Sequence, residues 1–404
     1  MNLKYKKVLK YVLISLIIIT TCYFVFNFVR VKTAKVNIIL KKDLTVEFAS
    51  NIHVSDMIKN MNGTIKNDYK IDTTKLGTKK IKFNFTNDDG ITIPYSYDVT
   101  IKDTTEPVIW LGNIYYVTTG SNIQLTDKIL CGDNYDNKPI CKIEGDYDLN
   151  QVGSYDLVFE ATDKNGNTNT KEFTLVVEAP YNNQSNEKNH PNIYTEFEDV
   201  VKTYKTKNTK IGIDISSFQG KVDFKKLKEA GVEFVMIRVG GTRGIDTDYF
   251  IDEQFENNII NANKYGIDAG IYFYSYANSI ESAKKDAKWV LKQIEDYKID
   301  LPIAFDWENW KYYNDYHLSF FGLTSMAESF VDVIEDAGYQ GMIYSSKTYL
   351  ENIWLPSNKD IWLAHYTDKT NYQGSYRMWQ MCENGRISGI SNAVDIDILY
   401  LDND

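Results

Sequence analysis

The strongest constraint on the fold of this chain is the alternation of short apolar runs with longer amphipathic segments from residue 210 to residue 404. Eight short runs, rich in Ile, Val, Leu and aromatic residues, have strand character: Ile211–Ile215, Phe234–Val239, Ala269–Tyr276, Leu301–Asp306, Gly341–Tyr344, Ile361–Tyr366, Arg377–Met381 and Val394–Leu399. Four segments between them have helical spacing: Asp223–Ala230, Asp252–Tyr265, Ile280–Tyr297 and Ser319–Ala337. This alternation predicts a parallel β/α architecture, and about 195 residues fit a small or incomplete (β/α) barrel.

Two carboxylates stand two positions apart at the end of one predicted strand, in the run 301–308. Residues i and i+2 of a strand share a face, so Asp306 and Glu308 point into the same space. Pairs of acids divide acid and base work in glycoside hydrolysis, and barrel chemistry sits at the carboxyl ends of strands. Barrel closure should bring Asp214 of the first strand and Asp395 of the last to the same end. An isolated D-x-E is more often a pair of solvated strand-end acids, so the surrounding sequence decides.

A series of short motifs accompanies this pair along residues 210–404. They are Gly212–Gly220 (D-x-S-x-x-Q-G), Asp252, Phe255, Asn258, Ala262 and Gly266 on one helix, Gly270–Ala277 (G-x-Y-x-Y-S-Y-A), Phe305–Glu308 (F-D-x-E), Trp362 with Tyr366, Trp379-Gln380, and Gly389 with Val394-Asp395. With these motifs in this order, the region resembles glycoside hydrolase family 25, the Chalaropsis-type lysozymes. It departs from the family at Arg238–Thr242, which lacks the Glu of K-x-T-E-G. His365 stands where Gln is common, and Asp397 where Asn is common; these departures concern substrate specificity more than chemistry.

The resemblance implies hydrolysis of the β-1,4 bond between N-acetylmuramic acid and N-acetylglucosamine in peptidoglycan. It makes Glu308 the general acid, which needs a raised pKa that burial beside Trp307 and another carboxylate would supply. Asp306 then stays charged and orients the 2-acetamido group of the substrate. Asp214 and Asp395 bind substrate and tune the charge of the pair. Retention or inversion depends on the separation of the carboxylates, which sequence does not give.

Aromatic residues at the strand ends have two interpretations, because they either stack on sugar rings or fill the barrel. We expect Tyr274, Tyr276 and Trp379 near the sugar. The C-terminal motifs add Gln380 and Tyr366 to the predicted substrate-binding residues.

Charge and residue content exclude several classes of function. The net charge of −10 and the pI of about 5.1 argue against nucleic acid as a partner. The four histidines show no H-x-x-H or H-E-x-x-H spacing and there is no Cys/His cluster, so we expect neither a metal site nor a cofactor.

The N-terminal segment 1–32 contains a run of 19 apolar and uncharged polar residues, Tyr11–Val29, which is long enough to span a bilayer. Four lysines precede the run, so the positive-inside rule predicts a cytoplasmic stub, a single transmembrane anchor and an exported remainder. The alternative is a cleaved signal peptide, but the exit Phe26–Arg30 is a poor cleavage site. A lipoprotein interpretation through Ile19–Cys22 has Thr before the Cys and is weaker.

Residues 33–103 and 104–178 form an internal repeat at an offset of 76, seen for example in Asn87–Gly90 and Asp163–Gly166. Short alternating strands joined by Asx/Gly turns predict two β-sandwiches, which resemble bacterial immunoglobulin-like modules. A spacer role is expected, with glycan or protein binding as the alternative. Residues 179–209 read as a linker, with a short helix over 196–204.

The four cysteines define one candidate disulfide. Cys131 and Cys141 flank a polar turn and could pair across a hairpin in an oxidising exterior, or remain two independent thiols. Cys22 lies in the apolar run and Cys382 is alone in the barrel.

The sequence therefore predicts a multidomain protein with a transmembrane helix, two all-β immunoglobulin-like sandwiches and a C-terminal α/β barrel of residues 210–404. Its predicted function is membrane-anchored peptidoglycan hydrolysis for cell-wall remodelling, with the enzyme facing the wall outside the cell. The predicted partners are glycan strands, the lipid bilayer and cell-wall machinery proteins. The alternative is a non-catalytic wall-binding or scaffold protein of the cell surface.

Overall fold

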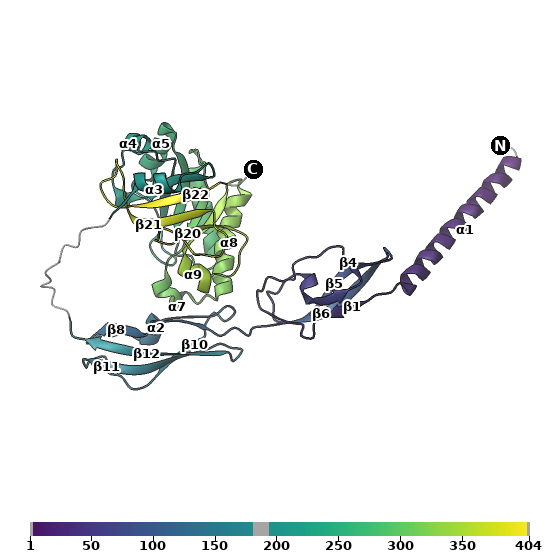
Figure 1. Cartoon of the computed structure of the whole chain (residues 1–404), viewed down its shortest axis with the longest axis horizontal. Helices are drawn as coiled ribbons and strands as arrows, with labels where there is room; N and C mark the ends of the chain where they lie inside the picture. Colours follow the sequence, from purple (N-terminus) through teal and green to yellow (C-terminus); the bar gives the residue numbers. More distant parts are fainter. Residues whose placement is uncertain (1–2, 181–193, 402–404) are drawn as a thin grey trace. The chain divides into compact units, whose positions relative to one another are not determined.

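The computed structural model of the chain describes residues 3–180 and 194–401 (Figure 1). It divides into two compact units, Met1–Thr104 and Thr105–Asp404, which are described separately below. Part of the predicted linker, residues 181–193, lies outside the described residues.

The first unit begins with helix α1 (Leu3–Thr33), which is drawn in purple in Figure 1. Its segment Lys7–Thr33 is long and apolar enough to cross a membrane, with a mean hydropathy of 2.3 over its most apolar stretch. The helix has no acidic residue in its first turn, and its apolar side chains are exposed on all sides. A helix that is apolar all round fits a lipid environment, although a signal sequence at this position would meet the same criterion.

The rest of the first unit is a small all-β fold, the first β module, made of two sheets. A two-stranded sheet pairs β1 (Ile38–Leu40) with β3 (Ile58–Met61), and a four-stranded sheet has the order β2 (Thr45–Glu47), β6 (Thr92–Lys102), β5 (Gly77–Asn87), β4 (Gly63–Ile65). Burial alternates along β5 and β6, so one face of the hairpin packs into the core and the other meets solvent. The core includes Val54, Phe85 and Val99, all fully buried.

The second unit begins with the second β module, which has the same strand arrangement. A two-stranded sheet pairs β7 (Val108–Trp110) with β9 (Leu130–Gly132), and a four-stranded sheet has the order β8 (Ile114–Thr118), β12 (Thr168–Glu178), β11 (Gly153–Thr162), β10 (Ile140–Glu144). The short helix α2 (Leu125–Lys128) connects β8 to β9 along the chain. A disulfide between Cys131 and Cys141 joins β9 to β10. The repeat in the sequence therefore corresponds to a repeat in topology.

The remainder of the second unit is a closed eight-stranded barrel, coloured teal to yellow in Figure 1. In sheet order the strands are β14 (Thr209–Ile215), β15 (Phe234–Thr242), β17 (Asp268–Tyr274), β18 (Ile303–Asp306), β19 (Gly341–Ser346), β20 (Asp360–Ala364), β21 (Met378–Arg386) and β22 (Val394–Tyr400). The first seven run parallel, whereas β22 is antiparallel to both β21 and β14 and closes the barrel. The short strand β16 (Tyr249–Ile251) adds to β15. All eight predicted strands are present.

Helices cover the outside of the barrel, and the four predicted ones are among them. They are α4 (Phe224–Glu229), α5 (Phe255–Tyr265), α6 (Ile280–Ile294), α7 (Tyr313–Tyr316), α8 (Phe320–Asp336) and α9 (Lys347–Asn352), with 3₁₀ turns η2 (Ser217–Gln219) and η3 (Trp310–Tyr312). Residues 194–209 also join the barrel: β13 (Thr195–Glu196) pairs with β21, and α3 (Phe197–Tyr204) buries Phe197 and Val200 in the core.

The barrel has an apolar interior that positions its polar residues at one end. Phe234, Met236, Ala304, Met342 and Met378 are fully buried inside the ring of strands. Because these side chains fill the barrel, polar groups on the inward face can gather only near its rim.

The second β module packs directly against the barrel. Asn314 of α7 donates from Nδ2 to the carbonyls of Thr126 (3.2 Å) and Ile129 (2.8 Å), and its Oδ1 accepts from the N–H of Cys131 (3.1 Å). A Cβ added to Gly132 would lie 2.6 Å from the ring of Phe320, so the backbone of β9 approaches the barrel as closely as only glycine permits.

Candidate active site

Asp214 of the first barrel strand and Asp395 of the last lie side by side because the last strand, β22, is antiparallel to the first. Asp214 lies near the carboxyl end of β14, and Asp395 lies near the start of β22; the two are register partners. A parallel last strand would have put Asp395 at the opposite end of the barrel. The predicted proximity is therefore present, but it depends on an antiparallel β22.

Gln380 of β21 ties this pair together. Its Nε2 donates to Asp214 Oδ2 (2.8 Å) and to Asp395 Oδ2 (2.9 Å). Its Oε1 accepts from the hydroxyls of Tyr344 (2.8 Å) and Tyr366 (3.2 Å). A buried amide with four partners has a fixed orientation, so Gln380 organises the acids.

The D-x-E pair stands at the carboxyl end of β18. Asp306 is the last residue of the strand and is 4% exposed, whereas Glu308 follows the strand and is exposed. The two side chains are hydrogen-bonded to each other, whereas Asp306 Oδ1 is buried without a hydrogen-bond partner among the described residues. Burial first, and then the neighbouring Glu308, raises the pKa of Asp306 well above its usual value. Although part of the Glu308 side chain reaches solvent, the surrounding protein desolvates its carboxyl and raises its pKa, so the pair holds one proton more readily than an isolated carboxyl.

The remaining acids have raised pKa values for the same reason. Burial raises the pKa of Asp214 to about 6 and, with the charges of Asp214, Glu383 and Glu308, that of Asp395 to about 8. A cluster of carboxyls whose pKa values are raised can donate protons near neutral pH, as a general acid must.

Asp397 is a fifth acid of the cluster that the sequence analysis noted only as a departure from the family pattern. Its side chain is fully buried, accepts a hydrogen bond from Trp362 Nε1 at Oδ1 (2.8 Å), and is hydrogen-bonded to Asp214. Two carboxyls can share a hydrogen bond only if one is protonated, and burial raises the pKa of Asp397 well above its usual value. Its place two residues after Asp395 on the same face of β22 was the available sequence signal.

Arg238 of β15 is the cation whose charge acts on the Asp306–Glu308 pair. No motif in the sequence had indicated this role. Its charge lowers the pKa of Asp306 against the larger effect of burial. Asp252 holds the guanidinium in an ion pair (Nη2–Oδ2, 2.6 Å), and Nη2 also donates to Ser217 Oγ (2.9 Å). The guanidinium lies over the ring of Phe218. Arg238 therefore partly balances the negative charge at this end of the barrel.

The predicted substrate-binding aromatics separate into two groups. Burial, and then the charges of Asp306 and Glu308, raise the pKa of Tyr274, and its ring meets that of Tyr276 at 5.5 Å. Tyr366 is 49% exposed and donates from its hydroxyl to Gln380.

Trp379 is the predicted aromatic that the structure does not bring to the carboxylates. It is 2% exposed, donates from Nε1 to the His365 carbonyl and packs edge-on against Tyr204 of α3. Side chains alternate along β21, so Trp379 faces the outer core while Gln380 faces the acids. This corrects the expectation that Trp379 stacks on the sugar.

The segment that follows Glu308 is held by aromatic packing. Trp307 is fully buried and donates from Nε1 to the Ala277 carbonyl (3.0 Å). Trp310 stacks on Tyr349 at 3.9 Å, and Tyr349 stacks in turn on Trp110 of the second β module at 5.0 Å. The second β module therefore contacts the segment that carries Glu308.

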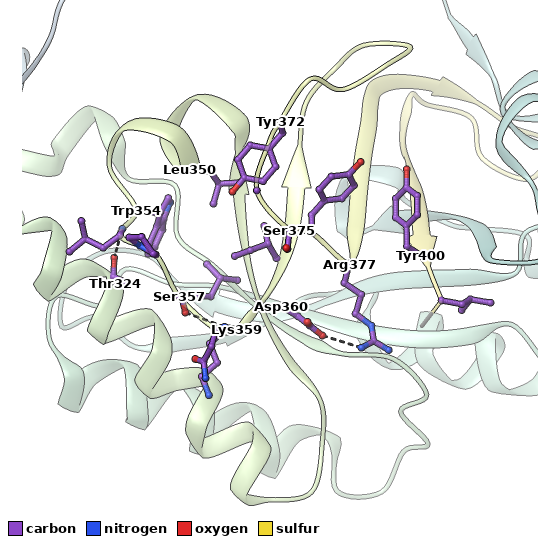
Figure 2. Close-up of a pocket in the computed structure, with 18 residues that line it drawn as sticks. Thr324, Leu350, Trp354, Ser357, Lys359, Asp360, Tyr372, Ser375, Arg377 and Tyr400 are labelled. Carbon is purple, nitrogen blue, oxygen red and sulfur yellow. Dashed lines mark hydrogen bonds and ion pairs between the residues drawn. The ribbon is translucent and has the colours of Figure 1, made fainter. Parts of the chain in front are cut away.

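A cavity of about 610 Å³ lies at the other end of the strands (Figure 2). Asp360 begins β20, Arg377 immediately precedes β21 and Tyr400 ends the antiparallel β22, so these lining residues mark the amino-terminal end of the parallel strands. Figure 2 shows the ion pair between Asp360 and Arg377 (3.1 Å). These groups belong to the end of the barrel opposite the acids.

The barrel is similar in sequence to a family of known proteins. Residues 213–390 match the sequence profile of Glycosyl hydrolases family 25. The chain is similar to the autolytic lysozyme of Clostridium acetobutylicum, with 30% identity over 189 residues, 46% of this chain and 54% of that protein. It is also similar to lysozyme M1 of Streptomyces globisporus, with 26% identity over 46% of this chain and 65% of that protein. Among solved structures, a family 25 glycosyl hydrolase from Bacillus anthracis matches with a TM-score of 0.42 and 21% identity, covering 50% of this chain and 93% of that one.

The chain thus spans less than two thirds of the length of the curated relatives it matches. The similarity to these relatives concerns about half of the present chain.

Proposed function

Because residues 213–390 match the profile of Glycosyl hydrolases family 25, we propose that this chain is a lysozyme. It hydrolyses the β-1,4 bond between N-acetylmuramic acid and N-acetylglucosamine in peptidoglycan. The observation that carries the proposal is the hydrogen-bonded pair Asp306–Glu308 with raised pKa values at the carboxyl end of the barrel. The lysozyme names of the two relatives agree with this substrate.

In the proposed mechanism, Glu308 donates its proton to the leaving oxygen, since it is the exposed member of the pair. Loss of that proton leaves charge beside Asp306, where Arg238 offsets it. Asp306 orients the 2-acetamido group, as in substrate-assisted hydrolysis, while Asp214 and Asp395 bind the sugar around Gln380. Tyr274, Tyr276 and Tyr366 supply rings and hydroxyls for the glycan.

The test uses the full chain in detergent micelles with purified peptidoglycan, and mass analysis of the released muropeptides. Glu308→Gln should lower the rate by about 10²–10⁴-fold, because it removes the proton donor while keeping the shape of the side chain. Asp306→Asn should cost a similar factor. Glu253→Gln, the same change at an exposed position of the barrel, should leave the rate unchanged.

Normal rates in both Glu308→Gln and Asp306→Asn would remove the assignment of the site. New reducing ends on glucosamine instead of muramic acid would show a different bond specificity. Glycan binding with no release by the wild-type protein would favour the non-catalytic wall-binding alternative.

We also propose that α1 anchors the enzyme in the cell membrane with its N-terminus in the cytoplasm and the barrel facing the wall. Four lysines within its first eight residues, Leu3–Lys10, support this orientation. The two β modules would then act as immunoglobulin-like domains between membrane and enzyme, in the service of cell-wall remodelling with wall-machinery partners.

A further inference from the structure

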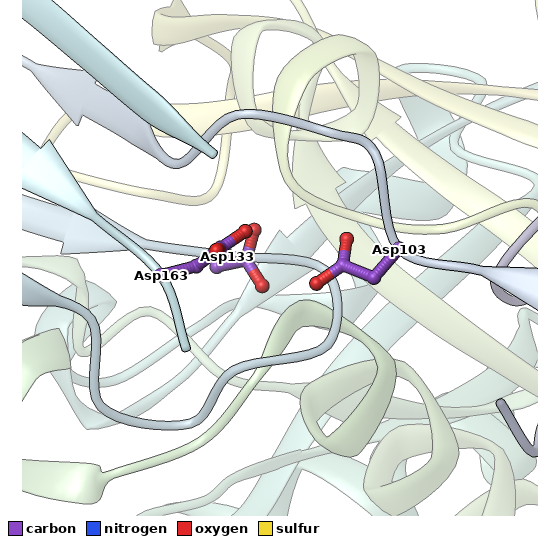
Figure 3. Close-up of side chains that lie close together, drawn as sticks. All are labelled: Asp103, Asp133 and Asp163. Carbon is purple, nitrogen blue, oxygen red and sulfur yellow. The ribbon is translucent and has the colours of Figure 1, made fainter. Parts of the chain in front are cut away.

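Two buried acids of the second β module face each other at one end of its sheets (Figure 3). Asp133 follows β9 and is 0% exposed, and Asp163 follows β11 and is 4% exposed. A carboxylate oxygen of each lies within 4.8 Å of the other. Asp103, the third side chain drawn, belongs to the first unit and is not part of the ligand set proposed below.

The backbone satisfies only part of this carboxylate pair. Asp163 accepts from the N–H groups of Asn165 (2.8 Å) and Asn167 (2.9 Å) at Oδ1, and from Asn167 Nδ2 at Oδ2 (2.6 Å). Asp133 accepts at Oδ1 from the N–H groups of Tyr135 (2.9 Å) and Asp136 (2.6 Å). Asp133 Oδ2 is buried, and within the described chain it has no hydrogen-bond partner. A buried carboxylate oxygen without a donor is costly unless a cation or a proton meets it.

In the first β module, uncharged asparagines occupy the two positions equivalent to Asp133 and Asp163. There Asn62 follows β3 as Asp133 follows β9, and Asn87 ends β5 where Asp163 follows β11. The turn after Asn87 is equivalent to the one after Asp163, because in each the side-chain Oδ1 accepts the backbone N–H four residues later at 2.9 Å.

In that module both amides are satisfied by donation. Asn62 and Asn87 each donate from Nδ2 to the carbonyl of Lys35, at 3.3 and 3.2 Å. A carboxylate cannot donate, so Asp133 and Asp163 cannot make the equivalent bonds. The second module has replaced two hydrogen-bond donors with two negative charges at equivalent positions.

We propose that Asp133 and Asp163 are ligands of a divalent cation of the calcium class. Carboxylate and carbonyl oxygens are the ligands that hard cations take, and the loops at these two residues offer oxygen groups without Cys or His. Ca²⁺ tolerates irregular geometry and variable coordination number, whereas Mg²⁺ demands a near-ideal octahedron. This site goes beyond the proposed lysozyme activity and does not depend on it.

The loop that carries Asp133 also contacts the barrel. The carbonyl of Asp133 accepts from the N–H of Phe320 (2.8 Å), and that of Asn134 accepts from the N–H of Phe321 (3.2 Å). These are the first two amides of α8, which lack partners inside the helix. A cation held by Asp133 would therefore stabilise the contact between the second β module and the barrel.

The test measures Ca²⁺ binding to the full chain in detergent micelles after removal of metal with EDTA. Calorimetric titration should give a dissociation constant on the order of 10⁻⁴–10⁻³ M, as in extracellular calcium modules, and the melting temperature should rise with Ca²⁺. Asp133→Asn and Asp163→Asn should each weaken binding by at least about tenfold and remove the thermal shift, because each removes one charged ligand. Asp146→Asn, the same change at an exposed position of the module, should bind as the wild type does.

Absence of binding to the folded wild type at 10 mM Ca²⁺ (about ten times the weakest constant expected) would overturn the site and leave a shared proton as the explanation. Equal binding by the wild type and both variants would overturn the assignment of Asp133 and Asp163. Equal affinity for Mg²⁺ would overturn the calcium class. If a variant does not fold, terbium luminescence of the wild type excited through tyrosine decides, since Ca²⁺ must displace the terbium if the site exists.

Discussion

Asp397 is where this chain departs from the common pattern of glycoside hydrolase family 25, and its protonation state contributes to the charge of the site. In its neutral form it donates to Asp214 while accepting from Trp362 Nε1. Asparagine would keep both hydrogen bonds, because its amide donates and its carbonyl accepts. We therefore predict that Asp397→Asn retains activity within about threefold at pH 5 and loses less activity than the wild type as the pH rises. The measurement is the pH profile of kcat/KM on peptidoglycan.

Asp397→Ala is the contrasting variant. It leaves the indole N–H of Trp362 and the carboxyl of Asp214 without this partner, so it should lower activity at every pH and destabilise the barrel by about 1–3 kcal/mol. Superimposable pH profiles for the wild type and Asp397→Asn would show that Asp397 does not titrate over the active range.

The raised pKa values of the buried acids Asp214 and Asp395 predict that the stability of the protein falls as the pH rises. Their pKa values are raised on folding, so the stability they contribute is fully present below the unfolded value near 4 and is lost as the pH rises through the folded values. Those values are about 6 for Asp214 and about 8 for Asp395. The melting temperature of the full chain should therefore fall between pH 5 and pH 9, and Asp395→Asn should reduce the fall. A flat or rising melting temperature over this range would contradict the raised values.

At the scale of elements, the sequence predicts those strands and helices whose burial imposes a regular hydrophobic pattern. The strands and the four predicted helices of the barrel follow from runs such as Phe234–Val239 and Ile280–Tyr297, because burial on one or both faces dictates their pattern. The direction of β22 does not follow from such a pattern, since an apolar run reads the same for parallel and antiparallel strands. The sequence thus predicted that Asp395 lies near Asp214, but not the antiparallel direction of β22 that brings them together.

Contacts between domains were the least predictable part. α3 lies in a polar stretch whose composition indicates a linker, and only two of its residues, Phe197 and Val200, are buried. Asn314 and Gly132, which join the second β module to the barrel, are ordinary surface residue types. Nothing local in their sequence distinguishes an interface from a turn.

Asn314 gives the test of this interface. Asn314→Ala removes three hydrogen bonds and leaves the N–H of Cys131 and two carbonyls without this partner, at a cost of about 2–4 kcal/mol. Because Asn314 lies six residues after Glu308, we expect a lower melting temperature and about a 3–10-fold fall in kcat. Asn352→Ala, which removes one hydrogen bond at the exposed last residue of α9, is the matched control. Unchanged melting and kcat in Asn314→Ala would show that the second β module does not support the site.

At the scale of the whole molecule, the two β modules share a topology but differ in their contacts. The core of the first module is its own, whereas Leu130 of the second belongs to the core of the barrel. Only the first module is therefore suited to be a simple spacer. A second module that contacts both the segment after Glu308 and α8 is better described as part of the enzyme.

The last prediction concerns α1 and the location of the enzyme. The candidate span Lys7–Thr33 has 27 residues, which makes it roughly 40 Å long, enough to cross the apolar core of a bilayer with tilt. The full chain should therefore stay with membranes after a carbonate wash, and external protease should release fragments that begin after about residue 33. Replacing Leu16 and Ile17 with Asp should shift the protein to the soluble fraction, since a charge at the centre of a span costs about 2.5–3.5 kcal/mol. A mature protein free in the medium, with its N-terminus near residue 30, would instead show that α1 is a cleaved signal sequence.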